Sequence, residues 1–389
     1  MENILVHDYA GHPFLFELSL ELSKSFKVSH AYHADDGGPK FEIPNSNSNK
    51  NLSILPLTSG IGYSKTNLVK RFIADLIIGF KLAKFIYINK FTTVFSANTP
   101  SWTQLIIILA CKYSGARFNY WLQDFYSYAV TAIISRKNPV LGKLLGKYTK
   151  GLDRLTFKLS DHIIVITEDF RTTLCSWHIN PKKITAIPNW GIRRLFDGLP
   201  SHKTSLTDEG KIKIIYTGTC AKKHRPDILL ALATYFPKVN FFIYTWGEGT
   251  KFFQNASLPN LKLYDLIPTN QLGATLKSAT FLISTLEKEA ASYCVPSKIL
   301  NYICAEVPII FIAPENNLAS KVLLENNLGY LINTYDFNEI FKAFKSIISD
   351  NDNYALKRKR LAQYNANYSC INSISKKFEN LLSSTTTKI

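Results

Sequence analysis

Short apolar runs alternate with segments of helical periodicity along most of this chain. The runs are typical of buried strands, and the segments between them repeat their apolar residues three or four positions apart, as one face of a helix does. Parallel strands need a crossover between them, and a helix is the usual crossover. The alternation therefore predicts a doubly wound parallel sheet.

One segment interrupts the alternation. Residues 195–210 are rich in Ser, Thr, Pro, Gly and His, which is typical of a linker. Before it, strands are predicted at 4–7, 93–96, 118–122, 162–166 and 184–187, and helices at 12–25, 103–113, 143–158 and 169–177. After it, strands are predicted at 213–216, 240–245, 261–263, 280–284 and 309–312, and helices at 226–235, 270–277, 296–304 and 317–326, with a largely helical end at 336–382.

A chain of 389 residues has the length of two domains. We predict an α/β protein of two Rossmann-like doubly wound parallel-sheet domains facing a cleft. The first domain covers residues 1–195, the linker 196–210, and the second domain 211–389, including the C-terminal helices. Ligands of such a fold bind at the carboxyl ends of the strands.

The formal net charge of +17 is concentrated in one region. Residues 61–160 carry 15 basic and three acidic residues, a net of +12. Such a patch attracts polyanions, either nucleic acid or the anionic face of a membrane, although a merely solvated basic face has the same composition. Within it, residues 72–88 fit a basic amphipathic helix that is too polar to span a membrane. It either lies on a membrane surface or packs on a sheet.

The cysteines point to no metal site. The six cysteines include no CxxC pair and have no histidines near them at metal-ligand spacing. We therefore expect buried thiols in a reducing cytosol and no zinc site. The chain starts with Met-Glu-Asn and runs directly into an apolar strand, so no signal peptide is expected.

Two segments at predicted strand ends are candidates for phosphate binding. The strand at 213–216 runs into a turn that contains Gly218, Thr219 and two lysines, and free N–H groups with lysine charge suit phosphate oxygens. The spacing is neither Walker A nor GxGxxG, and an ordinary strand–loop–helix junction shows the same pattern. After 240–245, Gly247-Glu248-Gly249 lets the backbone approach a ligand closely, although a plain tight turn has the same residues.

A third candidate opens the helix predicted at 296–304. Pro296 and Ser297 are favoured at a helix start, and Lys298 follows in the first turn. A cation at this place opposes the helix dipole. An anion bound between Lys298 and the free N–H groups would remove the conflict, so Lys298 is a candidate binding residue.

The order of these segments resembles the retaining glycosyltransferases of family 4, which have the GT-B fold. The closest likeness is to the WbuB-like subgroup, which builds bacterial O-antigens and capsules. In the second half, the resemblance rests on the Gly-Thr turn followed by lysine, the Gly-Glu-Gly turn, and Val-Pro-Ser-Lys at 295–298. In the first half it rests on FNYWLQDFYS at 118–127, DHIIVITED at 161–169 and IPNW at 187–190. It covers roughly residues 1–335.

The resemblance implies roles for the matching residues. Lys223 and Lys298 would hold the diphosphate of a nucleoside-diphosphate sugar and neutralise the leaving group, and Asp124, beside Gln123, would approach the sugar or the acceptor. No metal or other cofactor is implied. The other implied donor-binding residues are Gly11, Gly218, Thr219, Gly247, Glu248, Gly249, Pro296, Ser297 and Asn301.

The sequence departs from the family at several positions. Two glutamates eight residues apart are usual, and Tyr293 and Asn301 stand at those positions. Asn301 can hydrogen-bond a ribose hydroxyl but supplies no carboxylate, and Glu287 or Glu289 could replace it. The usual histidine before Asp124 is Gln123, and Glu306 replaces a usual glycine.

The function expected from the resemblance is hexosyl transfer in cell-surface polysaccharide biosynthesis. The donor would be a nucleoside-diphosphate hexose, amino-hexose or deoxy-hexose, and the acceptor lipid-linked or a polysaccharide. The enzyme would be metal-independent, retaining, cytoplasmic and peripheral on the inner face of the cell membrane, with no nucleic-acid partner. The alternative is a basic α/β protein that binds nucleic acid or membranes without transferase activity, but no nucleic-acid-binding module is recognisable. An NAD-dependent oxidoreductase is disfavoured because GxGxxG is missing after the first strand.

Overall fold

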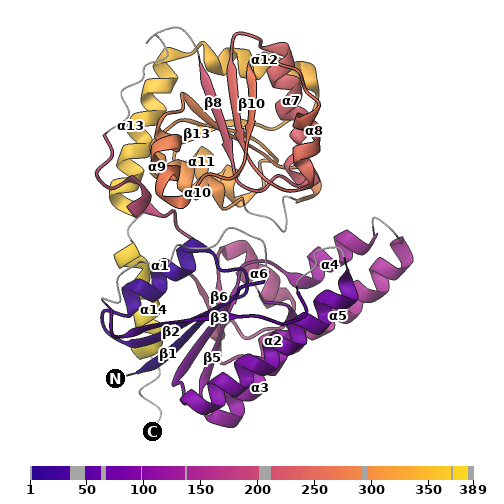
Figure 1. Ribbon diagram of the computed structural model, residues 1–389, viewed down its shortest axis with the longest axis vertical. Coiled ribbons are helices and arrows are strands. Elements are labelled where there is room, and N and C mark those ends of the chain that lie inside the picture. Colours follow the sequence, from indigo (N-terminus) through magenta and orange to yellow (C-terminus); the bar gives the residue numbers. More distant parts are fainter. Residues whose placement is uncertain are drawn as a thin grey trace. The chain divides into compact units, whose positions relative to one another are not determined.

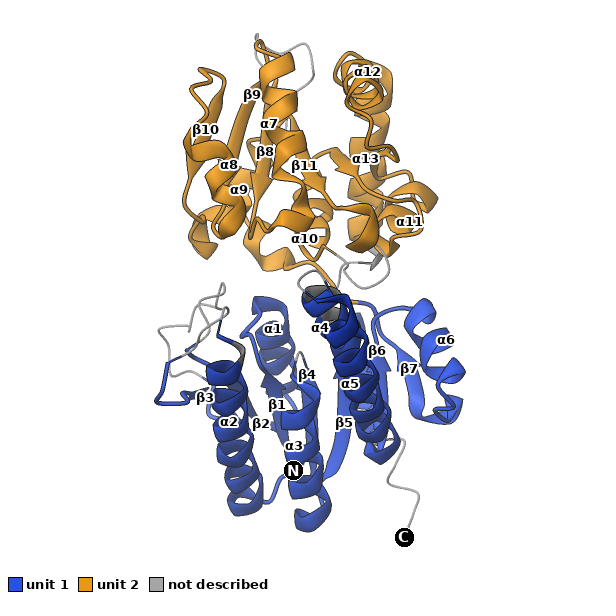
Figure 2. Ribbon diagram, turned by 90° about the vertical axis from the view of Figure 1, so that its right-hand side faces the viewer, with its two compact units in different colours: residues 1–188, 371–389 blue, residues 189–370 orange. Residues whose placement is uncertain are grey.

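The chain folds into two compact units, residues 1–188 with 371–389 and residues 189–370 (Figure 2). The computed structural model describes residues 2–35, 49–62, 67–97, 99–135, 138–200, 212–290, 296–368 and 371–383. The two units are described separately, and the cleft expected between them stays a prediction.

Unit 1 is built on a seven-stranded parallel sheet with helices along it (Figure 1). The strand order is β3-β2-β1-β4-β5-β6-β7. The strands are β1 (Asn3–Asp8), β2 (Lys27–His33), β3 (Leu52–Leu57), β4 (Thr93–Ala97), β5 (Arg117–Leu122), β6 (His162–Val165) and β7 (Ile184–Ala186). The helices are α1 (Pro13–Leu22), α2 (Leu68–Asn89), α3 (Ser101–Ser114), α4 (Tyr126–Ser135), α5 (Pro139–Leu159), α6 (Glu168–Ser176), α14 (Ile371–Ser383) and the 3₁₀ turn η1 (Pro181–Lys183).

Unit 2 repeats this topology with six parallel strands in the order β10-β9-β8-β11-β12-β13. The strands are β8 (Lys213–Thr217), β9 (Asn240–Tyr244), β10 (Leu261–Tyr264), β11 (Phe281–Thr285), β12 (Ile309–Ile312) and β13 (Gly329–Ile332). The helices are α7 (Pro226–Tyr235), α8 (Lys251–Gln254), α9 (Thr269–Lys277), α10 (Lys298–Ala305), α11 (Leu318–Glu325), α12 (Phe337–Ile348) and α13 (Asn351–Tyr368), with 3₁₀ turns η2 (Arg193–Phe196), η3 (Lys222–His224), η4 (Glu248–Thr250) and η5 (Lys288–Ala290). The predicted class of two doubly wound parallel sheets is thus confirmed.

Local sequence signals set the ends of the long helices. The Asn67 side chain accepts a hydrogen bond from Lys70 N at the start of α2, and the Asn138 side chain accepts from Val140 N and Leu141 N at the start of α5. Each contact satisfies N–H groups that the first helical turn leaves without a partner. The sequence analysis therefore placed these helices correctly, although it began both of them four residues late.

Three strands, β2, β3 and β13, and two helices, α4 and α8, were not predicted. In β2, the interior positions include the buried polar residues Ser29, His30 and His33, so the segment lacks an apolar run. In β3, Pro56 lowers the strand signal, and the strand lies at the sheet edge, where proline is tolerated. The edge strand β13 is only four residues long, and no element was predicted at the positions of β13 and α4.

The C-terminal helix α14 belongs to unit 1, whereas the sequence analysis grouped residues 371–389 with the second domain. Its residues Ile374, Phe378 and Leu382 are four apart, form one apolar stripe and are buried. The Phe378 ring lies 5.5 Å from Phe95 and 4.8 Å from Trp121. Burial of this stripe on the first sheet is the physical reason for the difference.

The other end of unit 2 also differs from the predicted division, which placed 189–195 in the first domain and 196–210 in a linker. Phe196 is buried in the core of unit 2, and Leu195 packs against that core. Gly191 lies so close to α10 that a Cβ atom there would be 2.4 Å from Leu300 O. Residues 189–200 are therefore part of unit 2, and residues 201–210 of the predicted linker lie outside the described residues.

Two histidines on neighbouring strands are buried in unit 1. The Nδ1 atom of His7 is 2.9 Å from Ser96 Oγ, and that of His30 is 2.8 Å from Ser19 Oγ. Burial lowers the pKa of His7 to about 3 and that of His30 to about 4, and the nearby Asp8 only partly opposes this. Both imidazoles are therefore neutral in the folded protein at neutral pH.

These histidines should make unit 1 sensitive to acid. Their folded-state pKa values lie below the unfolded value of 6.5, so unfolding takes up protons, and stability present above pH 6.5 is lost as the pH falls toward 4. We expect the free energy of unfolding to fall by about 1.4 kcal/mol per pH unit for each histidine. Urea denaturation between pH 7 and pH 5 measures this slope. His30→Gln should reduce it and the exposed His178→Gln should not; equal slopes in all three proteins would contradict the assignment.

Candidate functional site

The strand order of unit 2 places β8 beside β11, where the direction of the chain across the sheet reverses. Ligands of open parallel sheets bind in the crevice at such a switch point, beyond the carboxyl ends of the strands. The segment from Gly218 to Lys223 follows β8, and Glu287 follows β11. The two segments meet there, because Glu287 N donates to Lys223 O at 2.7 Å.

The turns after β8 and β9 are joined by hydrogen bonds. Cys220 N donates to Trp246 O at 2.9 Å, Gly249 N donates to Cys220 O at 2.9 Å, and Trp246 Nε1 donates to Thr219 Oγ1 at 3.1 Å. The approach is close, since a Cβ on Gly249 would lie 2.7 Å from both Cys220 O and Cys220 Sγ. The predicted Gly-Thr and Gly-Glu-Gly turns are therefore fastened to each other, and the N–H groups of Cys220 and Gly249 are used in this contact.

Lys298 reaches this surface from α10. Its Nζ lies 3.7 Å from the centre of the Tyr216 ring, a cation–π contact. Gly218 has a φ of 96°, which favours glycine, and it lies beside the Lys298 side chain, since a Cβ there would be 3.5 Å from Lys298 Cε, an ordinary contact distance. Tyr302 fastens α10 to β8 by accepting a hydrogen bond from Thr217 N at 2.9 Å. Lys298 and Gly218, which are 80 positions apart, are thus in contact.

Lys223 lies at the same place. His224 is buried, and its Nδ1 accepts a hydrogen bond from Ala221 N at 3.0 Å. Burial, followed by the positive charges of Lys298 and Lys223, lowers the pKa of His224 to about 2. Lys223 is the residue before His224, and its backbone oxygen accepts the hydrogen bond from Glu287 N. The sequence analysis missed His224, since its burial depends on residues far away in the chain.

The remaining predicted residues of unit 2 lie at different places. Pro296 and Ser297 precede Lys298, and Ser297 occupies the N-cap position without a side-chain hydrogen bond to the helix. Glu248 is exposed, and its Oε1 lies 3.5 Å from Lys222 N. Asn301 Oδ1 accepts a hydrogen bond from Ile192 N at 2.9 Å, so this oxygen secures the segment before β8. Tyr293 lies outside the described residues.

An open hollow of about 470 Å³ adjoins the Gly-Glu-Gly turn. Trp246 and Gly247 line one part of it, and Tyr264 and Asp265, at the end of β10, line another. Aromatic side chains beside a glycine backbone suit a planar ring system. The candidate site of unit 2 therefore combines a cationic part at Lys223 and Lys298 with an aromatic part.

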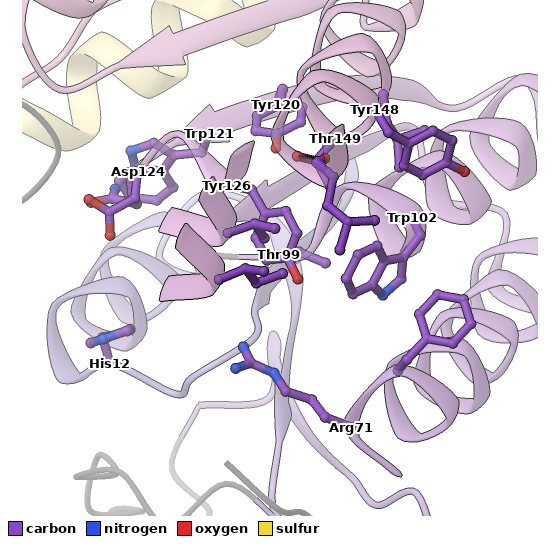
Figure 3. Close-up of a pocket in the computed structure, with 16 residues that line it drawn as sticks. His12, Arg71, Thr99, Trp102, Tyr120, Trp121, Asp124, Tyr126, Tyr148 and Thr149 are labelled. Carbon is purple, nitrogen blue, oxygen red and sulfur yellow. Dashed lines mark hydrogen bonds between the residues drawn. The ribbon is translucent and has the colours of Figure 1, made fainter. Parts of the chain in front are cut away.

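Unit 1 holds a larger cavity of about 610 Å³ at the end of its own sheet (Figure 3). His12 and Thr99 line it from the segments after β1 and β4, which are the neighbouring strands at the switch point of this sheet. Gln123 and Asp124, which follow β5, line it as well. Tyr120 and Trp121 of β5 also line the cavity, and the other lining residues lie on four helices: Arg71, Phe72, Trp102, Tyr126, Val130, Ile134, Leu145, Tyr148, Thr149 and Leu152.

Asp8 shapes the segment that contains Gly11. Its buried carboxylate accepts hydrogen bonds from Ala10 N and His12 N, and the His12 ring lies 3.3 Å from it. Gly11 has a φ of 76°, which favours glycine. This geometry carries His12 to the cavity, whereas the role of Gly11 opposite the donor stays a prediction.

Two negative findings concern the part of the chain that the structure describes. No helix there is long and apolar enough to cross a membrane. No group of three or more His, Cys, Asp or Glu side chains there has the geometry of a metal site.

The close approach of the two turns generates a prediction about stability. Gly249→Ala should push the turns after β8 and β9 apart and destabilise unit 2 by about 1–3 kcal/mol, since Cys220 O leaves no room for a methyl group. Gly151→Ala on α5 is the matched control, because nothing lies within 4 Å of a Cβ there. Thermal unfolding compares them, and an unchanged melting temperature for Gly249→Ala would refute the joined-turn geometry.

No protein-family profile and no curated protein sequence matches the chain. Its fold is similar to that of several solved structures. Sucrose-phosphate synthase from Thermosynechococcus elongatus has a TM-score of 0.76 at 12% identity, with 99% of both chains covered. HepE from Anabaena, in complex with UDP-glucose, has a TM-score of 0.70 at 13% identity, covering 99% of this chain and 100% of that one. WaaG, a glycosyltransferase involved in lipopolysaccharide biosynthesis, has a TM-score of 0.67 at 11% identity, covering 97% and 99%. The likeness is one of fold, and the predicted GT-B fold is confirmed.

Proposed function

We propose that this protein is a glycosyltransferase that takes a sugar from a nucleoside-diphosphate sugar. The observation that carries the proposal is that Lys298 reaches the turn after β8, which contains Gly218 and Lys223, at the switch point of unit 2. Lysine charge complements the phosphate groups of a diphosphate. Structures of the similar HepE contain UDP-glucose or UDP, which supports the same ligand class here.

The geometry suggests how the donor would lie. Its diphosphate would contact Lys223 and Lys298, and its base would occupy the hollow beside Trp246 and Tyr264. Glu287 is the better substitute for the missing ribose-binding glutamate, because its backbone already bonds Lys223. Asn301 keeps a smaller role, since its Oδ1 bonds Ile192 N.

In the proposed reaction, an acceptor hydroxyl oxygen bonds to the anomeric carbon while the bond from that carbon to the β-phosphate oxygen breaks. The hydroxyl proton passes to the departing phosphate, whose negative charge the two lysines stabilise. Asp124, at the cavity of unit 1, would orient the hydroxyl by accepting its hydrogen bond. Lysine charge takes the place of a metal ion, so we propose a metal-independent reaction.

The finer assignment follows the resemblance. We propose a retaining hexosyltransferase of family 4, near the WbuB-like subgroup, that acts on a hexose, amino-hexose or deoxy-hexose. The acceptor would be a lipid-linked or polysaccharide intermediate of an O-antigen or capsule. The likeness to WaaG, which is involved in lipopolysaccharide biosynthesis, supports this setting.

The surface of unit 1 supports a peripheral position on the inner face of the cell membrane. Asp75 and Asp153, the acids of α2 and α5, are buried, so every charged side chain that these helices expose is basic. Large apolar side chains are exposed between them. On α2 these are Val69, Phe72, Ile73, Phe80, Tyr87 and Ile88, and on α5 Val140, Leu141, Leu144, Tyr148 and Leu155. Apolar and basic groups side by side suit an anionic lipid surface better than nucleic acid.

Donor binding is tested by thermal shift with UDP-, GDP-, ADP- and dTDP-sugars. One donor class should raise the melting temperature. At a ligand concentration of a hundred times Kd, bound donor adds about 2.7 kcal/mol to the free energy of unfolding. Lys223→Ala and Lys298→Ala should lose the shift and slow transfer about 10²–10³-fold, since they remove charge from the leaving group. Lys345→Ala, an exposed lysine of α12, should retain both, and EDTA should leave the rate unchanged. Wild-type rates in both site variants would show that the phosphate assignment is wrong.

Membrane docking is tested by vesicle flotation. The protein should float with phosphatidylglycerol vesicles at low salt and lose binding at high salt or with neutral vesicles, because screening weakens exposed charges. Lys143→Glu with Lys147→Glu on α5 should reduce binding, whereas Lys342→Glu with Lys345→Glu on α12 should have a smaller effect. Binding that persists in both high salt and neutral vesicles would contradict the electrostatic mechanism.

A further inference from the structure

The cavity of unit 1 has two chemically different ends (Figure 3). His12 and Asp124 lie at one end, where the strands finish, and Trp102 and Tyr148 lie on the opposite side. Arg71 projects between the two ends. A ligand that fills this cavity therefore has a polar group near Asp124 and an apolar body among the helices.

The apolar end is built for a body larger than a sugar ring. The α4–α5 hairpin contributes aliphatic side chains to the wall: Val130, Ile134, Leu145 and Leu152. The facing wall is aromatic, with the rings of Phe72 and Trp102 5.1 Å apart and those of Trp102 and Tyr126 5.0 Å apart. The walls also carry polar groups, among them the hydroxyls of Tyr126, Tyr148 and Thr149, but the side formed by α4 and α5 is largely aliphatic. A volume of about 610 Å³ is ample for a hydrocarbon chain.

The hairpin that forms this wall is held in a fixed shape. Asp153 on α5 accepts hydrogen bonds from Ser101 Oγ at the start of α3 and from Ser127 N at the start of α4, the latter at 3.0 Å. Gly146 lets the helices touch, since a Cβ there would lie 2.1 Å from Thr131 Oγ1. The cavity is thus bounded by helices with defined contacts.

Arg71 places a positive charge on the wall of the cavity, and Asp124 lies elsewhere on the wall. Arg71 is one helical turn from the buried Asp75, whose pKa it lowers against the larger effect of burial. The Tyr9 hydroxyl donates to Asp75 and so ties α2 to the segment after β1. Asp75 balances part of the Arg71 charge, and the exposed lysines of α2 and α5 lie outside the cavity. An anionic group next to the apolar body would therefore bind better than a neutral one.

The mouth of the cavity continues onto an exposed apolar surface. Phe72 and Tyr148 line the cavity and are also 42% and 69% exposed. Leu144 and Val69, in the first turns of the same two helices, are 66% and 69% exposed and lie among lysines. A hydrocarbon chain can thus pass from a lipid surface to the cavity along apolar side chains.

We infer that this cavity binds the hydrocarbon chain of a lipid phosphate, with the phosphate at Arg71 and the glycosylated end toward Asp124. The assignment of this lipid as the acceptor rests on the proposed function, whereas its binding does not. The inference names a chain-binding site within unit 1, apart from the basic outer surface. It selects a lipid-linked acceptor over a free polysaccharide.

The experiment is calorimetric titration of the full chain, without donor, with dimethylallyl, geranyl and farnesyl phosphate below their critical micelle concentrations. Affinity should rise at least tenfold from dimethylallyl to farnesyl phosphate, since each buried methylene strengthens binding several-fold. Farnesol and inorganic phosphate should both bind more weakly than farnesyl phosphate. Affinity that does not depend on chain length, or benzyl phosphate binding as tightly as farnesyl phosphate, would overturn the inference, the latter in favour of an aromatic acceptor.

Matched variants locate the site. Leu152→Trp fills the cavity and should weaken farnesyl phosphate binding at least tenfold, whereas Leu155→Trp on the exposed face of the same helix should not. Arg71→Gln should remove most of the preference for farnesyl phosphate over farnesol, and Lys70→Gln, at an exposed neighbour outside the cavity, should retain it. Unchanged melting temperatures confirm that the variants fold. Equal affinities of Leu152→Trp and Leu155→Trp would exclude the cavity as the site.

The two proposals fail separately. Farnesyl phosphate binding without any thermal shift by a nucleotide sugar would sustain the lipid site and remove its assignment as the acceptor site. A donor shift without chain-dependent lipid binding would leave the transferase proposal intact and overturn the lipid site.

Discussion

In each sheet the strands run parallel, and the first and fourth strands of the sheet are neighbours. The chain crosses the sheet in opposite directions from these two strands, so the loops after them separate and leave a crevice at one edge of the sheet. In unit 2 this brings the turn after β8 next to the segment after β11, and Lys223 O meets Glu287 N. In unit 1 it brings His12 and Thr99 to the edge of one cavity. The two candidate sites are therefore the same topological feature used twice. Their chemistry differs because the loops that pass over the edge differ, cationic in one unit and aromatic in the other.

The electrostatics of unit 2 are arranged for an anion that reaches two positive charges. Lys298 lies over the face of Tyr216, which stabilises the cation without neutralising it. Lys223 is the residue before His224, whose imidazole is buried. The pKa of that imidazole, His224, is lowered mainly by burial and further by both lysines, so it adds no third positive charge. Its Nδ1 instead orders the turn by accepting a hydrogen bond from Ala221 N. The protein thus holds the Lys298 charge and the turn that contains Lys223 in place before a ligand arrives, and this lowers the cost of binding.

Periodicity predicted most of the fold, and particular residues explain where it failed. The predicted strand at 309–312 and the predicted helix at 226–235 agree with β12 and α7, because their apolar patterns coincide with their burial. Strand β2 was missed since His30 and His33 are polar in the sequence and buried in the sheet. Helix α14 shows its apolar stripe in the sequence, but only tertiary packing reveals that Phe378 lies on Trp121 of the first unit. For the site, turn chemistry indicated Gly218, Gly249 and Lys298, whereas His224 and the second function of Asn301 depend on contacts with residues distant in the chain.

The same two helices give unit 1 both its basic outer surface and its cavity. Asp75 and Asp153 turn inward and use hydrogen bonds to Tyr9, Ser101 and Ser127 to hold α2 and α5 in place. With their acids buried, the charged side chains that the helices expose are lysines and arginines, and these lie among exposed apolar side chains. Each buried acid therefore has two effects. It accepts hydrogen bonds that hold its helix in the unit, and it adds no negative charge to the surface. Replacing either acid would affect folding as well as charge, whereas the lysines of α5 are exposed and can be changed alone. The outer surface and the cavity share Phe72 and Tyr148, but Leu152 belongs to the cavity alone and the lysines of α5 to the surface alone, and this allows the binding of a lipid surface and of a single lipid chain to be separated.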